Sequence, residues 1–136
     1  MLPASTTEKG QCAAYPNTCK TPAGETVVLL PYANNAALEH SDMNTVASTV
    51  FIVGKNAVTE NSEIVASSGD EAGVDGGVIS GTVSGSCRFR LGSSAVSIEG
   101  YAVAYSGTLI GQNGANANAP SGIQVSPSQA RVFVEP

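Results

Sequence analysis

The chain has 136 residues, of which only 12% are charged and 5% aromatic, with 15 glycines, seven prolines, no tryptophan and a formal net charge of −5. The low charge excludes an intrinsically disordered chain, the many glycines exclude a helical bundle, and the acidic balance argues against nucleic acid as a partner. We therefore expect one small, mainly β domain, residues 1–136, with many turns.

The sequence contains no segment typical of membrane insertion or secretion. No run of about eighteen apolar residues is present, and the N-terminus, MLPASTTEKGQC, has neither the basic start nor the apolar stretch of a signal peptide. We therefore expect a cytoplasmic protein that leaves the cell only if a secretion machine carries it.

Residues 1–44 are expected to be mostly extended and irregular. Four prolines remove backbone donors from this part, at positions 3, 16, 22 and 31. One strand is predicted, over ETVVLLPY (25–32), and the polar stretch 34–46 favours at most a short helical turn.

Residues 45–136 contain a weak internal repeat with an offset of 46 residues, which divides them into units 45–90 and 91–136. Its members are Ser48, Val50, Ile52, Gly54, Ile64, Gly76 and Ser80, which fall on Ser94, Val96, Ile98, Gly100, Ile110, Gly122 and Ser126. The spacing of Val50, Ile52 and Gly54 is typical of a strand followed by a tight turn. Between the copies, residues 77–94 predict two further short strands, and the two units are expected to wrap a common centre.

The stretch SSGDEAGVDGGVISG (67–81) combines acidic residues with glycines. Asp70, Glu71 and Asp75 are suitable calcium ligands, but counted from Asp70 the anchor positions of an EF-hand hold the wrong residues, and a phosphate loop would need a lysine. The favoured interpretation is a rigid corner, in which glycines allow close approach and carboxylates accept backbone N–H groups. This predicted structural corner consists of Gly69, Asp70, Glu71, Gly73, Asp75, Gly76 and Gly77.

No catalytic set is apparent. His40 is the only histidine, no nucleophile elbow is present, and the few aromatic residues argue against a glycan-hydrolysing cleft. No enzymatic activity is therefore predicted.

A metal site is the weaker of two interpretations of the cysteines. Cys12, Cys19, His40 and Cys87 have the composition of a Cys₃His zinc set, but not its compact spacing. Buried or paired cysteines are favoured, and zinc is the alternative.

Five blocks of the sequence, in order, resemble PAAR-like domains, the tip proteins of type VI secretion and related contractile injection systems. The blocks are GQCAAYPNTCKTP, PYANNA, SSGDEAGVDGGVISG, FRLGSSAVSIEGYAV and IGQNGANANAP. The resemblance extends from about Gly10 to Pro127. It implies a small β-rich cone that caps a trimeric VgrG-type β-helical spike, with one chain per trimer, helps it to puncture a target membrane and carries or recruits an effector.

The resemblance also raises the question of zinc. Zinc-binding PAAR tips hold the ion mainly with histidines near the apex, and the PAAR-like pattern often has a histidine where this chain has Gln112. Since His40 is the only histidine, we expect a metal-free tip whose corner is held by hydrogen bonds, with the cysteine set as the alternative.

A single chain on a threefold spike must present three similar edges. We expect the 46-residue repeat to supply two of them and the segment around ETVVLLPY to supply the third. The spike-binding residues predicted in that segment are Val27, Val28, Leu29 and Leu30. Two alternative functions are an effector-loading adaptor and a stand-alone metal-binding β adhesin module.

Overall fold

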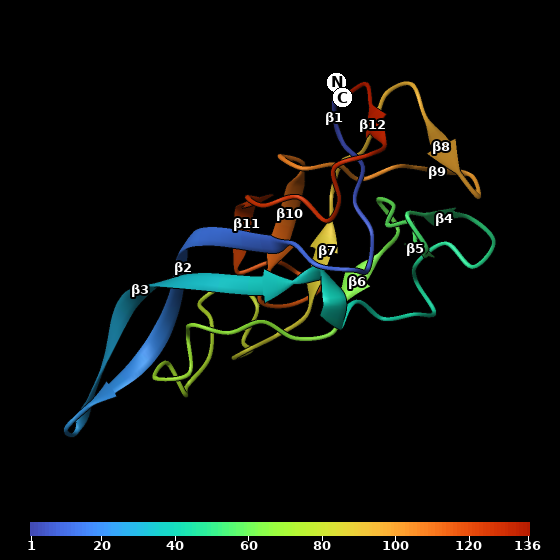
Figure 1. Cartoon of the computed structure of the whole chain (residues 1–136). Coiled ribbons are helices and arrows are strands. Elements are labelled where there is room, and N and C mark those ends of the chain that lie inside the picture. The colour runs from blue at the N-terminus through green and yellow to red at the C-terminus, as the bar shows by residue number, and fades with distance from the viewer.

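The structure, a computed structural model that describes all residues 1–136, is built almost entirely of antiparallel β-strands (Figure 1). Its only helical element is a single 3₁₀ turn, Leu38–His40. The prediction of a mainly β fold is confirmed. The strands are β1 (Leu2–Pro3), β2 (Gln11–Ala23), β3 (Thr26–Ala37), β4 (Phe51–Ile52), β5 (Lys55–Asn56), β6 (Glu63–Ile64), β7 (Cys87–Phe89), β8 (Ser97–Ile98), β9 (Tyr101–Ala102), β10 (Leu109–Gln112), β11 (Ala119–Gln124) and β12 (Phe133–Val134).

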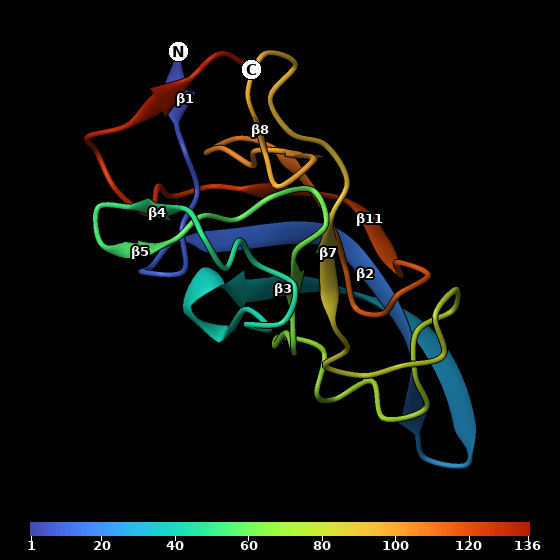
Figure 2. The same cartoon turned by 90° about the vertical axis from the view of Figure 1, so that its right-hand side faces the viewer.

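Six strands form one antiparallel sheet in the order β3-β2-β11-β10-β7-β6. Its longest component is the β2–β3 hairpin, which turns at Gly24 and Glu25 and whose outer half projects away from the rest of the chain (Figures 1 and 2). We call the part of this hairpin beyond its bulge, residues 17–32, the ribbon; Thr18 and Lys20 hydrogen-bond to the loop 67–85, and the tip around Gly24 projects.

The long strand β2 is not expected from the sequence, because it contains two prolines. A β-bulge between Ala14 and Asn17 accommodates Pro16. Lys20 directs its backbone N–H and C=O away from β3, toward Gly76 and Asp75. Two residues further on, Pro22 has the same orientation, so its missing N–H removes no hydrogen bond between the two strands.

The main core lies against the inner face of this sheet. It consists of Cys12, Ala36, Leu38, Val46, Val58, Ile64, Cys87, Phe89, Ala104 and Ile110. The two short strands predicted within residues 77–94 reduce to β7 alone. Residues 78–80 form a turn, closed by the bond from the Gly81 N–H to the Gly77 carbonyl, and residues 81–86 belong to no strand.

Candidate docking surface

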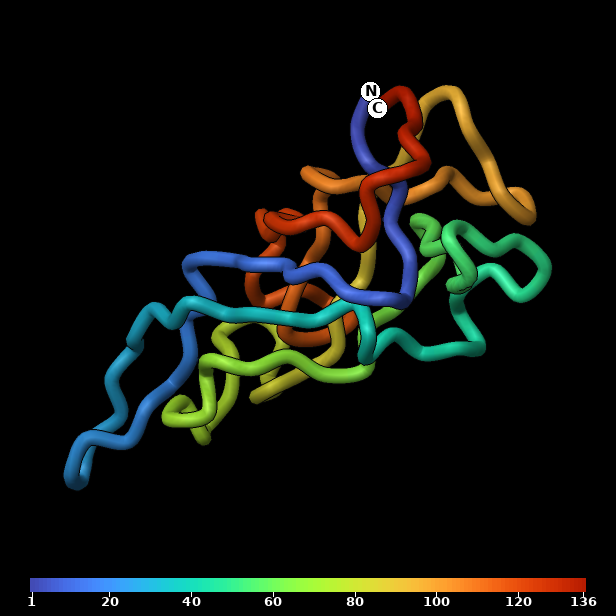
Figure 3. Tube along the Cα trace, in the orientation of Figure 1, coloured from blue at the N-terminus to red at the C-terminus, as the bar shows by residue number.

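Three two-stranded hairpins gather at the end of the molecule that carries both chain termini (Figure 3). They are β4–β5, β8–β9 and β12–β1, and we call them together the base. Val53 and Gly54 turn the first hairpin, and Glu99 and Gly100 turn the second, all four with positive φ, as in a type I′ turn. The third pair of strands, β12 and β1, has no connecting turn. The two chain ends lie at the position that the turn occupies in the other two hairpins.

The strand registers of the three hairpins are the same. Phe51 pairs with Asn56, Ser97 with Ala102 and Phe133 with Pro3. One hydrogen bond beyond each hairpin also repeats: Ala57 donates to the Val50 carbonyl at 3.1 Å, Val103 to Val96 at 3.1 Å and Ala4 to Val132 at 3.0 Å. The hairpins are therefore three copies of one local structure.

A closed ring of backbone hydrogen bonds joins the three copies. The N–H of Val58 donates to the Ser5 carbonyl at 3.0 Å, that of Ala104 to Val58 at 2.9 Å, and that of Ser5 to Ala104 at 2.9 Å. All three residues are fully buried. A cyclic pattern of this kind requires three units around a common axis, so the base has pseudo-threefold symmetry.

A second ring of three backbone hydrogen bonds, formed by neighbouring residues, repeats this cyclic pattern. Its bonds run from Thr7 to the Asn56 carbonyl (3.1 Å), from Glu60 to Ala102 (2.8 Å) and from Ser106 to Pro3 (2.8 Å). Within the base, a small apolar core fills the axis, and its buried members are Ala4, Ala47, Ile52, Ala57, Val103 and Val134.

The third copy differs from the sequence-based expectation. The 46-residue offset relates β4–β5 to β8–β9, but the third hairpin comes from the two chain ends and not from ETVVLLPY. Residues 1–7 consequently belong to the base. Val27–Leu30 lie instead on the ribbon, far from the base in both views (Figures 1 and 2).

Each hairpin leaves one strand edge unpaired. The carbonyls of Asn56, Ala102 and Pro3 point into the second ring, away from β4, β8 and β12. Their cross-strand partners therefore also direct N–H and C=O away from the hairpin, because such pairs exchange no hydrogen bonds. Phe51, Ser97 and Phe133 thus present free backbone donors and acceptors, and Phe51 and Phe133 are 58% and 44% exposed.

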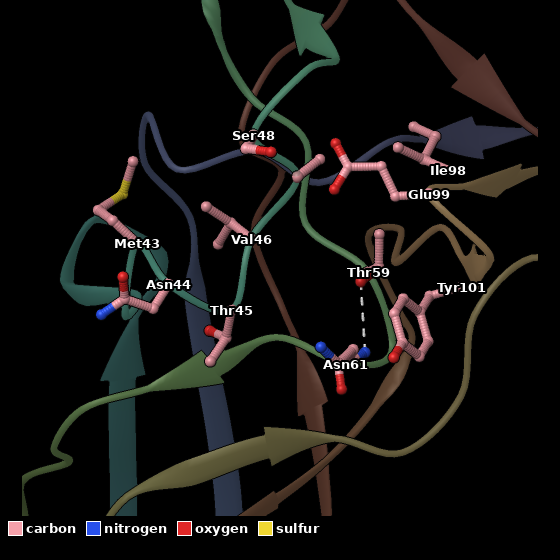
Figure 4. A pocket seen from close by; sticks show the side chains of 11 residues that line it. Met43, Asn44, Thr45, Val46, Ser48, Thr59, Asn61, Ile98, Glu99 and Tyr101 are labelled. Atoms are coloured by element: carbon pink, nitrogen blue, oxygen red, sulfur yellow. Dashed lines mark hydrogen bonds between the residues drawn. The ribbon is translucent and has the colours of Figure 1, made fainter.

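A hollow of about 290 Å³ lies on the flank of the base, between the loop 43–48 and the turn of β8–β9 (Figure 4). Glu99 accepts hydrogen bonds from the Thr49 hydroxyl at 2.6 Å and the Thr49 N–H at 2.9 Å, and these bonds lower the pKa of Glu99. Glu99 and Tyr101 are the only ionisable side chains of the lining.

Away from the base, a buried polar cluster fixes the loop 67–85 to β2. Asp70 is fully buried and accepts hydrogen bonds from Asn17 Nδ2 at 2.9 Å and from the Ser84 N–H at 3.0 Å. Asn17 Oδ1 in turn accepts from Asn118 Nδ2 at 2.6 Å and Asn113 Nδ2 at 3.1 Å. Three segments that are distant in the sequence, around Asn17, Asp70 and Asn113–Asn118, are thereby joined. We call these residues, Asn17, Asp70, Asn113 and Asn118, the amide cluster.

The glycines of the predicted corner sit where a side chain would collide. A Cβ atom on Gly73 would lie 2.4 Å from Cys19 Cβ, one on Gly77 2.4 Å from the Asn118 side chain, and one on Gly69 2.1 Å from the Ala33 carbonyl. The Gly69 N–H donates to Glu71 Oε1 at 2.7 Å. Gly76 adopts a φ of +93°, and its carbonyl accepts from Lys20. In contrast to the expectation, the carboxylate of Asp75 is exposed and accepts no hydrogen bond.

The four residues of the alternative zinc set do not come together. Cys12 and Cys87 lie in the main core, Cys19 lies beside Asn17 and Asp70, and His40 is exposed at the end of the 3₁₀ turn. No group of three or more His, Cys, Asp or Glu side chains in the chain is arranged to hold a metal ion.

All three cysteine side chains have raised pKa values. Burial raises the pKa of Cys12 to about 12 and that of Cys19 to about 11, the latter with help from the charge of Asp70, and burial also raises the pKa of Cys87. Gln112, at the expected histidine position, is buried, and its Oε1 accepts from Asn34 Nδ2 at 2.9 Å.

Comparison with known families gives one match. The family model described as "Toxin PAAR-like domain" matches residues 10–119 of the chain. Neither the comparison with curated proteins nor that with solved structures gives a match. In addition, no helix of the structure has the length and hydropathy needed to cross a membrane.

Proposed function

The chain belongs to the toxin PAAR-like domain family, which implies a role at the spike tip of type VI secretion systems, and we propose that it caps a trimeric VgrG-type spike with its base. One chain would sit on one trimer. As the tip, it would assist membrane puncture and carry an effector, and it is assigned no chemical reaction.

One observation carries this proposal: a single chain builds a pseudo-threefold end. The closed ring of Ser5, Val58 and Ala104 holds three copies of one hairpin around a common axis. A surface of threefold character matches a partner of threefold symmetry, because each of its three copies can make the same contact with one subunit.

The free strand edges indicate how the partner is held. Phe51, Ser97 and Phe133 each present an unused N–H and C=O at this end. Backbone groups of this kind are satisfied by an added strand, so we propose that the last strand of each spike subunit pairs with one hairpin. The spike and its tip would then form one continuous β-structure, which suits the transmission of force.

The test is a mixture of the chain with candidate spike trimers, read by size exclusion with mass determination. A complex of one chain per trimer is expected. Ser97→Pro removes a free N–H without breaking a bond inside the hairpin, and should weaken docking by about tenfold or more, whereas Ser97→Ala, which keeps the N–H, should not. Absence of a complex with every trimeric spike of the host would refute the proposal.

Two other functions are tested by the same material. If the chain is mainly an effector-loading adaptor, it should bind an effector or its chaperone more tightly than the spike. If it is a metal-binding adhesin module, calcium or zinc should raise its melting temperature by mass action. Before docking we place the chain in the cytoplasm, and after firing outside the cell or in the target cell.

A further inference from the structure

The ribbon carries a second unpaired strand edge, distinct from the base. Strand β3 is the last strand of the six-stranded sheet, so nothing pairs with its outer side along residues 26–31. Pairing on that side begins only at Asn35, whose N–H and C=O exchange two hydrogen bonds of 2.8 Å with Ser68.

The register shows which backbone groups are free. Leu29 pairs with Lys20, whose N–H and C=O are used by Gly76 (2.8 Å) and Asp75 (3.2 Å) on the far side of β2. The pair therefore exchanges no hydrogen bonds, and Leu29 directs its own N–H and C=O outward. Asn35 leads to the same conclusion. Its N–H and C=O point outward to Ser68, and because orientation alternates along a strand, the backbone groups of residues 27, 29 and 31 also point outward.

This edge lacks the protection that natural edge strands carry. Residues 26–34 contain no charged side chain, and Pro31 stands at only one end of the free stretch. Both faces are apolar: Val27 and Leu29 are 55% and 59% exposed on one, and Val28 and Leu30 are 38% and 41% exposed on the other.

We propose that the outer edge of β3 binds an extended segment of a partner protein as an added strand. Its chemistry follows from the edge. Because both faces of β3 are apolar, the bound segment is apolar on both faces, and because residues 26–34 offer no counter-charge, it is uncharged over the paired stretch. The ribbon and the base lie at opposite ends of the chain (Figures 1 and 2), so this segment can bind while the base is occupied.

A second copy of the chain is a poorer occupant than such a segment. Two β3 edges paired antiparallel about Leu29 would place Val27 of each copy opposite Pro31 of the other. Pro31 has no N–H, so both Val27 carbonyls would remain unpaired. A partner strand without proline satisfies every free group.

The experiment uses the full chain and a capped peptide, Lys-Thr-Val-Leu-Val-Thr-Lys, whose end lysines lie beyond the paired stretch. In the free chain, the amides of Val27 and Leu29 should exchange with solvent much faster than those of Val28 and Leu30, and the peptide should slow them. Slow exchange of the Leu29 amide before the peptide is added would overturn the proposal.

Two variants at one position separate backbone pairing from apolar contact. Leu29→Pro removes the outward N–H while keeping every bond to β2, and should weaken peptide binding about tenfold or more relative to Leu29→Ala, which keeps the N–H. Equal binding by the two variants, no binding by the native chain at about 1 mM peptide, or dimerisation that Leu29→Pro abolishes would each overturn it. Spike docking is measured separately, so loss of one activity is distinguishable from loss of the other.

Discussion

Asn17 and Asp70, 53 positions apart in the sequence, meet in the interior with Asn17 Nδ2 2.9 Å from Asp70 Oδ2. Asp70 has no cation beside it: its two oxygens accept from neutral donors, and Asn17 passes the connection on to Asn113 and Asn118. Buried polar groups are costly unless every partner is in place, so this cluster fixes one arrangement of the loop 67–85 against β2.

Removal of the Asp70 carboxylate should destabilise the fold strongly. Asp70→Ala leaves Asn17 Nδ2 and the Ser84 N–H without acceptors in the interior, at a cost of about 3 kcal/mol in the free energy of unfolding. Chemical denaturation measures it. Asp75→Ala is the matched control, since its exposed carboxylate accepts no hydrogen bond, and it should change the stability by less than about 0.5 kcal/mol. Equal effects of the two substitutions would contradict the role given to the amide cluster.

Gly73→Ala should cost about 2 kcal/mol or more, because the new Cβ would lie 2.4 Å from Cys19 Cβ. Gly24→Ala provides the comparison: a Cβ there meets nothing within 4 Å, and only the φ of +66° is unfavourable, at about 1 kcal/mol. Thermal melting of the two variants ranks them. A more stable Gly73→Ala protein would show that the corner is less tightly packed than described.

The buried thiols should make the protein sensitive to alkali. The pKa of Cys12 is raised from 9.0 to about 12 in the folded chain, so the folded state keeps a proton that the unfolded chain loses. Stability is full below pH 9 and falls as the pH rises from 9 toward 12, by up to about 1.4 kcal/mol per pH unit for each thiol. In Cys12→Ala, the slope of unfolding free energy against pH should be smaller. An unchanged slope would contradict burial of this thiol.

Metal removal should leave the protein unaltered. No group of metal-binding side chains is assembled, and the amide cluster already occupies the acceptor oxygens of Asn17 and Asp70. We expect the same melting temperature in a chelator and in added zinc, and no stoichiometric metal in the purified protein. A melting temperature several degrees lower in the chelator would show that the protein binds a metal ion, at the cysteines or at another site.

Joining the chain ends should preserve the base. A permuted chain in which Asn-Gly replaces Glu135, Pro136 and Met1 between Val134 and Leu2, with new ends opened at Gly24, gives the third hairpin the two-residue turn that Val53–Gly54 and Glu99–Gly100 provide. Spike docking should be retained. Deletion of residues 129–136 is the counterpart, since it removes β12 and should abolish docking. Loss of docking in both would show that the third hairpin needs free ends.

Hairpins β4–β5 and β8–β9 could be predicted from the sequence, because each is one contiguous segment in which alternating apolar residues are followed by a glycine. The third could not, since its two strands stand at opposite ends of the chain and no offset aligns them. Strand β2 escapes prediction for a related reason: whether Pro16 and Pro22 interrupt a ladder depends on the bulge and on which side each residue faces. The corner glycines and Asp70 are recognisable locally, but the asparagines that meet them lie too far along the chain.

The pseudo-threefold base has a consequence for imaging. On a trimer with true threefold symmetry, a tip rotated by 120° makes the same set of contacts, so the three orientations have equal energy and occur equally often. A reconstruction averaged with imposed symmetry would then show the three hairpins clearly, while the ribbon, which has no counterpart in the other two sectors, would be spread over three positions and lose its density.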